Sequence, residues 1–152
     1  MVRTKKIYRQ HLLQGAFQLI VEQGFEQFHA RNIAKKMACS TQPIYREFQT
    51  LQEYKQAAST YILEKVEQAI QLSETTTLSE LTENICSYAQ QVPKEFQRFF
   101  LMDDCCRNEI KQVLRQHFQQ LAPAEDFETF WYYTLGKAAV KSFEKIPKVL
   151  AK

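Results

Sequence analysis

Residues that form tight turns are scarce in this chain, which has only three glycines and four prolines in 152 residues. An all-β fold places such residues at most of its turns, so the composition argues against one. Apolar runs are short, the longest being four residues at 99–102 and 130–133, whereas a membrane-spanning helix needs about 20. No apolar signal segment follows the basic start, so we expect a cytoplasmic protein. The sequence predicts an all-α fold.

Motifs of common enzymes and metal sites are missing as well. The chain has no G-x-S-x-G and no phosphate-binding glycine loop, and His11, His29 and His117 fall in separate predicted helices. Asp and Cys at 103–106 could be combined with His117 into a zinc site. Structural zinc spacing is absent, however, and adjacent helical residues point about 100° apart. We expect neither an enzyme nor a bound cofactor or metal.

The four cysteines are Cys39, Cys86, Cys105 and Cys106, and none of them belongs to a C-x-x-C motif. This pattern favours reduced thiols, as is usual in the cytosol. A redox or thiol-reactive role for Cys105 and Cys106 is the alternative, with Arg107 as the only adjacent activating cation.

Positive charge is concentrated in the N-terminal third of the chain. Residues 1–55 hold nine of the 20 Lys and Arg residues and four of the 17 Asp and Glu residues, so the remainder is slightly acidic. Four of the nine, Arg3, Lys5, Lys6 and Arg9, form a basic arm. Such a distribution suits phosphate binding, because neutralised phosphates release counterions, although a merely solubilising surface would look the same.

Apolar spacing predicts eight helices. The first extends from a cap at Thr4 to Gly24 and buries Leu13, Ala16, Phe17, Ile20 and Val21. The others are a short helix at 30–37, a third capped by Ser40, and a long fourth from about Thr50. A Thr77–Glu80 capping box opens the fifth, which ends at Pro93. The sixth spans roughly 94–105, and the last spans about 125–146. The seventh, between them, has on its apolar face Ile110, Val113, Leu114, Phe118 and Leu121.

The second and third of these helices have the form of a helix-turn-helix. In that motif the second helix places its N-terminal residues against base edges in the major groove of DNA. Here those residues are Thr41 and Gln42, followed by Pro43 and Tyr45. Gln can pair with adenine, Thr can contact a base, and a Tyr hydroxyl can reach a phosphate.

Residues 12–58 resemble the DNA-binding domain of the TetR family of transcriptional regulators. The similarity lies in Leu13, Ala16 and Phe17, Gly24 and Phe25, the segment 31–35 (RNIAK), Ser40, and the segment 44–48 (IYREF). Three positions differ: His29 stands where the family usually has Ser or Thr, Ala38 stands where it has Gly, and Leu51 stands where many members have Lys. The turn at Ala38 is therefore expected to be mildly strained.

The resemblance implies a DNA-binding domain at 1–50 and a helical ligand-binding and dimerisation domain at 51–152. It implies a ligand-responsive regulator, a repressor, that binds a palindromic operator as a homodimer. The alternative is a helical interaction protein that has kept the fold and lost DNA binding. The candidate DNA contacts are His29, Arg31, Thr41, Gln42, Pro43, Tyr45, Arg46 and Lys55.

Eight aromatic residues and one methionine of the C-terminal part are candidates for lining a pocket for a small hydrophobic or aromatic effector, although they would serve equally well as core. They are Tyr61, Tyr88, Phe96, Phe99, Phe100, Met102, Phe118, Phe127 and Trp131.

The last predicted helix is apolar nearly all the way round. Such a helix has to be covered on two sides, by its own body and by something else, and a second copy satisfies this requirement. The alternative is a central helix buried within a monomer. The candidate interface residues are Phe130, Tyr133, Gly136, Ala139, Val140 and Phe143.

Overall fold

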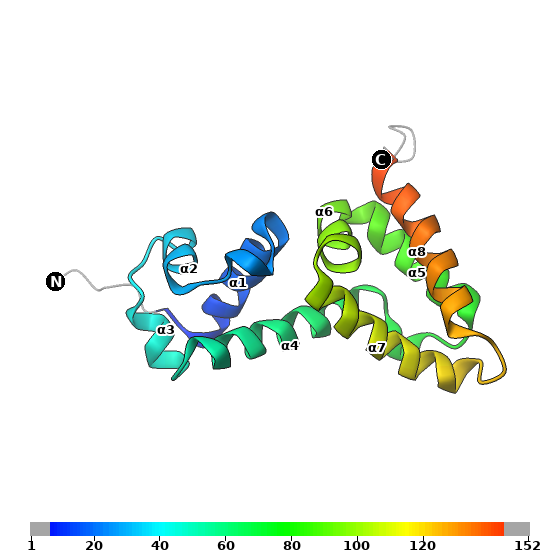
Figure 1. The fold of residues 1–152 in the computed structure, drawn as a ribbon, viewed down its shortest axis with the longest axis horizontal. Helices are drawn as coiled ribbons and strands as arrows, with labels where there is room; N and C mark the ends of the chain where they lie inside the picture. Colours follow the sequence, from blue (N-terminus) through cyan, green and yellow to red (C-terminus); the bar gives the residue numbers. More distant parts are fainter. Residues whose placement is uncertain (1–6, 145–152) are drawn as a thin grey trace. The chain divides into compact units, whose positions relative to one another are not determined.

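A computed structural model describes residues 7–144, which are helical with no strand in that range (Figure 1). The predicted all-α fold is confirmed. Contacts divide the chain into two compact units, Met1–Ile62 and Leu63–Lys152. This boundary lies within a long helix, α4 (Leu51–Ala69). The functional boundary expected after residue 50 stays a prediction. No helix of the described range is long and apolar enough to cross a membrane.

The N-terminal unit contains α1 (Arg9–Gln23), α2 (Ala30–Lys36), α3 (Gln42–Glu47) and the first part of α4, with one 3-10 turn at Phe25–Gln27 (Figure 1). As predicted, α1 ends at Gly24, whose φ of 90° is a conformation that glycine adopts without strain. The predicted cap at Thr4 lies outside the described residues.

The buried side of α1 differs from the prediction. Leu12 and Leu19 are buried together with Ala16 and Ile20, whereas Leu13, Phe17 and Val21 are only half-buried. The helix has apolar residues on more than one side, and two stripes of helical period can be drawn through them. The choice between these stripes is made by what packs on the helix.

A tyrosine of α4 organises this unit. Tyr54 is fully buried, stacks on Phe48 with ring centroids 4.6 Å apart and meets Phe28 at 4.9 Å. Its hydroxyl donates to the carbonyl oxygen of Leu12 in α1 at 2.5 Å. Burial raises the pKa of Tyr54, so the hydroxyl stays protonated and remains a donor. One side chain thus connects α1, the segment after α1, the end of α3 and α4.

The turn between α2 and α3 contains the strain that its sequence predicts. Ala38 has a φ of 52°, in the left-handed region where an L side chain costs about 1–2 kcal/mol. Its side chain is exposed, so little packing depends on the methyl group.

Ala38→Gly is expected to stabilise the protein by about 0.5–1 kcal/mol, because relief of strain outweighs the greater freedom of glycine in the unfolded chain. Urea denaturation followed by circular dichroism measures the change. Ala57→Gly, within the regular part of α4, is the control and should destabilise by about 1 kcal/mol. A loss of stability in Ala38→Gly would contradict the strained turn.

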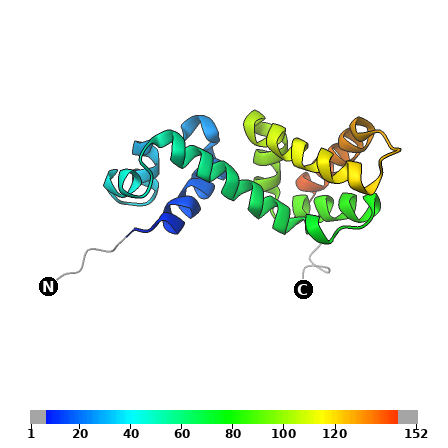
Figure 2. The ribbon, with the colours of Figure 1, turned by 90° about the horizontal axis from the view of Figure 1, so that it is seen from below.

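The C-terminal unit contains α5 (Leu78–Gln91), α6 (Pro93–Phe96), a π-helix η3 (Gln97–Met102), α7 (Asp104–Leu121) and α8 (Phe127–Phe143), preceded by a 3-10 turn at Leu72–Glu74. Packing is most extensive between α5 and α8 (Figures 1 and 2). Thr77 caps α5 as predicted, its hydroxyl accepting from the Glu80 N–H at 3.1 Å. The Glu80 carboxylate accepts from the Thr76 hydroxyl at 3.0 Å.

Two predicted boundaries were wrong. The helix expected at 94–105 ends at Met102, because the Asp103 carboxylate accepts from the Cys106 N–H at 3.3 Å and starts α7 there. The last helix begins at Phe127 and not at 125, since the Asp126 carboxylate accepts from the Thr129 N–H at 3.0 Å. It ends at Phe143, and the predicted end at Ile146 lies outside the described residues.

Candidate functional site

The helix-turn-helix consists of α2 and α3. His29 is the N-cap residue of α2, as predicted, but its ring contacts the amide nitrogen of Asn32 at 3.0 Å and makes no capping hydrogen bond. Thr41, and not Ser40, is the N-cap residue of α3. The Ser40 hydroxyl still accepts from the Gln42 N–H at 3.3 Å, so it satisfies one free donor of the first turn.

Helix α3 has one buried side and one exposed side. Ile44 and Phe48 are 0% and 2% exposed, whereas Tyr45 is 50% exposed. Gln42 and Arg46 are also exposed, so these two polar residues and Tyr45 make up the accessible surface of this short helix. Pro43, however, is buried, and Thr41 is half-buried.

The guanidinium group of Arg46 has partners within the protein. It donates to the carbonyl oxygen of Ile7 and lies 3.6 Å from the Glu47 carboxylate. The guanidinium carbon of Arg9 lies 4.3 Å from the centre of the Phe48 ring. Two basic residues thus connect α3 to the segment where α1 begins, and both remain solvent-exposed. Arg3, Lys5 and Lys6 of the basic arm lie outside the described residues.

The other candidate DNA contacts are on α2 and α4. Arg31 is exposed in the first turn of α2. Lys55 of α4 is exposed too, and its ammonium group lies 5.5 Å from the centre of the Phe25 ring. Sequence reasoning did not single out Lys36, which pairs with Glu22 at 2.7 Å and joins α2 to α1.

The aromatic residues proposed to line an effector pocket lie in two different units. Tyr61 is in the N-terminal unit, where it packs edge-on against Phe17 at 6.0 Å. Met102 is 60% exposed at the end of η3. The rest are buried core of the C-terminal unit: Tyr88, Phe96, Phe99, Phe100, Phe118, Phe127 and Trp131.

These seven core residues pack largely against one another. Phe96 and Phe100 stack at 4.8 Å, and Phe100 and Trp131 stack at 6.4 Å. Phe118 meets Phe127 edge-on at 5.4 Å. Few of them line the surface grooves of this unit: Phe118 borders one groove, and Phe100 and Trp131 border another. An effector site made of the predicted set stays a prediction.

Helix α8 has a buried face and an exposed apolar face. Phe130 was predicted to lie in the interface, but its ring packs on that of Phe118 with centroids 5.2 Å apart. Phe130 therefore belongs to the core of its own unit. Tyr133, Val140 and Phe143 are 63%, 61% and 74% exposed. Gly136 is exposed too, and no atom lies within 4 Å of the position that a Cβ would take there. Ala139 is half-buried beside them.

The two buried cysteines, Cys86 and Cys106, offer little reactive thiolate. Burial raises the pKa of both Cys86 and Cys106, and for Cys106 the nearby Asp103 carboxylate raises it further. Cys105 is exposed. Within residues 7–144 no group of three or more His, Cys, Asp or Glu side chains could hold a metal ion, so Asp103–Cys106 and His117 are not assembled into a site.

Comparison with known proteins gives one type of match. No family model and no curated protein matches the sequence. A solved structure from Vibrio parahaemolyticus, described as a TetR family protein and assigned as a transcriptional regulator, aligns with a TM-score of 0.58. The identity is 18%, and the alignment covers 94% of this chain and 92% of that one. Identity at this level shows the fold alone, and it shows that this chain has the TetR-like all-α fold which residues 12–58 predict.

Proposed function

We propose that the protein is a TetR-like DNA-binding transcriptional regulator that reads duplex DNA with α3. The observation that carries the proposal is that α3 has one buried apolar side and one exposed polar side. Its apolar residues Ile44 and Phe48 are buried, while Gln42, Tyr45 and Arg46 are exposed. These exposed residue types are those that hydrogen-bond to base edges and phosphates.

Each exposed residue has a distinct role in the proposal. Gln42, with Thr41 beside it, contacts base edges, since a Gln amide can pair with adenine through two hydrogen bonds. The Tyr45 hydroxyl, Arg46 and Arg31 bind phosphates, and Lys55 and His29 lie close to the backbone of the DNA. Pro43 acts through packing alone, because it is buried. Arg46 keeps donors for a phosphate, since a guanidinium group carries five.

The regulator is proposed to act as a two-fold homodimer formed through the exposed face of α8. One helix as short as α3 reads few base pairs, whereas two copies about 34 Å apart read a palindrome. A face that bears Tyr133, Val140 and Phe143 around an open Gly136 suits close packing against its own symmetry mate. Binding of an effector in the C-terminal unit would change the spacing of the two DNA-binding domains of the dimer and release the operator, as in a repressor.

Tyr45→Phe tests the contact of α3 with DNA. The variant keeps the ring and removes the hydroxyl, so we expect it to lose about 1 kcal/mol of binding free energy, or about fivefold in affinity. Fluorescence anisotropy with duplexes from the regions flanking the protein's own gene measures this loss. Tyr132→Phe is the matched control, since Tyr132 is also an exposed tyrosine and lies on α8, outside the helix-turn-helix. Equal affinities of parent and Tyr45→Phe would show that Tyr45 makes no contact with phosphate.

A second function is favoured by one observation. Arg46 and Lys36 are both engaged within the protein, with Ile7, Glu47 and Glu22 as their partners. Basic side chains that are bound within the protein suit a helical interaction protein that has kept the fold and lost DNA binding. Arg46→Ala separates the two functions, because each copy of a DNA-binding homodimer would lose one phosphate contact, and the slope of log K against log salt should become shallower by about two.

A further inference from the structure

A groove of about 400 Å³ opens between η3, α7 and α8 in the C-terminal unit. One part of its lining is apolar and comes from Phe100, Trp131, Tyr132 and Leu135. The other part is polar and contains Arg107, Asn108 and Lys111 of α7. A hollow of this size with an apolar wall and a few converging polar groups is the usual form of a small-molecule site.

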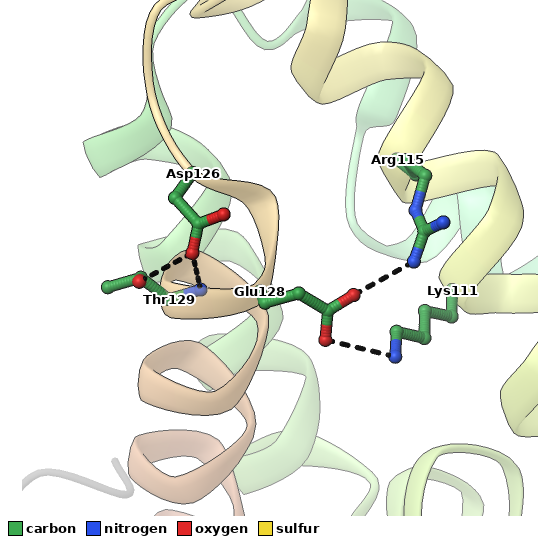
Figure 3. Close-up of polar contacts among 5 residues, drawn as sticks. All are labelled: Lys111, Arg115, Asp126, Glu128 and Thr129. Carbon is green, nitrogen blue, oxygen red and sulfur yellow. Dashed lines mark hydrogen bonds and ion pairs between the residues drawn. The ribbon is translucent and has the colours of Figure 1, made fainter.

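Lys111 lies where the apolar part of the groove lining meets the polar part. Its ammonium group lies 5.8 Å from the centre of the Trp131 ring and 5.6 Å from that of Tyr132. Its carboxylate partner, Glu128, is 3.4 Å away, and that carboxylate also binds Arg115 at 2.9 Å (Figure 3). Glu128 is therefore shared between two cations, which leaves Lys111 only partly neutralised.

Arginine 107 completes the polar part. It donates to the carbonyl oxygen of Leu101 at 2.7 Å and pairs with Asp104. Together Arg107, Lys111 and Arg115 bring three positive charges against the two carboxylates of Asp104 and Glu128. The cluster thus has one net positive charge beside an aromatic wall, and one carboxylate of a ligand would balance it.

The wall opposite α7 is irregular backbone. Residues Gln97–Met102 form a π-helix, in which the Asp103 N–H reaches back to the carbonyl oxygen of Arg98 at 2.9 Å. Such segments are rare and occur frequently at functional sites. Here the wide turn contributes Phe100 and Leu101 to the groove, and Arg107 binds the carbonyl group of Leu101.

The charge of this groove distinguishes it from two other hollows of the unit. A groove of about 380 Å³ beside Thr82 is bordered by Glu125 and Asp126, and one of about 460 Å³ is bordered by Glu67 and Glu74. Both would repel an anion. The groove at Lys111 combines basic and aromatic lining, so it fits an anionic ligand.

We propose that this groove binds a small aromatic monocarboxylate, with its ring against Trp131, Tyr132 and Leu135 and its carboxylate held by Lys111 and Arg107. The role of this ligand rests on the proposed function, since such a compound would be the effector of the regulator. Binding itself is independent of DNA and can be measured in its absence.

Trp131 is the single tryptophan of the chain, so its fluorescence reports on the groove directly. The probe is 3-phenylpropionate, titrated to about 10 mM because ligands this small bind weakly. The matched probe is 3-phenylpropionamide, which has the same shape and no charge. We expect a saturable change in emission with the acid and an affinity about tenfold lower for the amide, because charge-assisted hydrogen bonds are lost.

Two variants locate the carboxylate. Lys111→Gln should lower the affinity for the acid about tenfold and leave that for the amide unchanged. Lys137→Gln is the control, because the Lys137 ammonium also lies near a tyrosine ring, 6.0 Å from that of Tyr133, but outside the groove. This control should bind the acid like the parent, and circular dichroism should show both variants folded.

Several results would overturn the proposal: equal binding of acid and amide by the parent, no saturable change in Trp131 emission, or equal losses in the two variants. The comparison of acid and amide uses the parent protein, so it remains decisive even if Lys111→Gln fails to fold. Failure of DNA binding alongside saturable acid binding would remove the proposed function and leave this site standing. Duplex binding without acid binding would do the reverse.

Discussion

Val140→Asp is expected to turn a dimer into a monomer of 17.9 kDa. Val140 is 61% exposed in the single chain, so the substitution should leave the fold of each unit unchanged. In a two-fold interface the two aspartates would be buried without partners, and each copy would carry one. We expect a cost of about 3 kcal/mol or more, which lowers the association constant about 100-fold.

Sedimentation at about 10 µM measures this change, since a weakened dimer dissociates at such concentrations. Val92→Asp is the control because Val92 is an exposed apolar residue outside α8, and it should remain dimeric. A parent protein that sediments at 17.9 kDa would contradict the proposed dimer, and with it the palindromic operator. If Val140→Asp remained dimeric, the interface would have to lie elsewhere than on this face of α8.

Tyr54→Ala should destabilise the N-terminal unit by about 3–5 kcal/mol, the usual cost of deleting a buried aromatic ring. The ring contacts Phe48 and Phe28, and its hydroxyl binds Leu12, so the variant loosens α1 and the end of α3 together. Because α3 bears the exposed Gln42 and Tyr45, duplex binding should be lost along with stability. Urea denaturation followed by circular dichroism gives the free energy.

Tyr54→Phe separates the ring from the hydroxyl. It should cost about 1 kcal/mol, the net contribution of one buried hydrogen bond. Tyr45→Phe is the control, since the half-exposed Tyr45 hydroxyl should contribute nothing measurable to stability. If both substitutions at position 54 left stability unchanged, Tyr54 would not be the residue that connects α1, α3 and α4.

Local signals in the sequence were sufficient for much of the fold. The fold class, the end of α1 at Gly24 and the cap at Thr77 follow from residues within one or two turns of each other. The TetR-like fold followed from the short segments that carry the resemblance. Even the strain at Ala38 was visible, because one methyl group stands where a left-handed turn favours none.

Other features depend on contacts that no local pattern contains. Whether α1 buries Leu12 or Leu13 is decided by its packing partners, and both choices have helical period. The break before Asp103 had a signal, since Asp is a good N-cap residue, but the apolar run at 99–102 favoured one continuous helix. The π-helix had no such signal.

The groove at Lys111 likewise depends on contacts that could not be predicted from the sequence. Lys111 and Glu128 are far apart in the chain and come together only when α7 and α8 pack (Figure 3). Arg107, Lys111 and Arg115 stand four residues apart in the sequence, a spacing that on a helix usually means a solvated face. Aromatic residues proposed as pocket lining proved to be mostly packed core, because apolar spacing does not distinguish core from cavity wall.

Duplex DNA binding as a function of salt is the most direct test of whether α3 reads DNA. If Arg31, Arg46 and Lys55 of both copies neutralise phosphates, the six contacts predict that log K falls with log salt with a slope of about −5. Anisotropy titrations of the parent protein between about 50 and 200 mM salt give this slope. A slope near that value, with preference for one duplex over random DNA, is the expected result. Absent binding, or binding independent of salt, would contradict a DNA-reading role for α3.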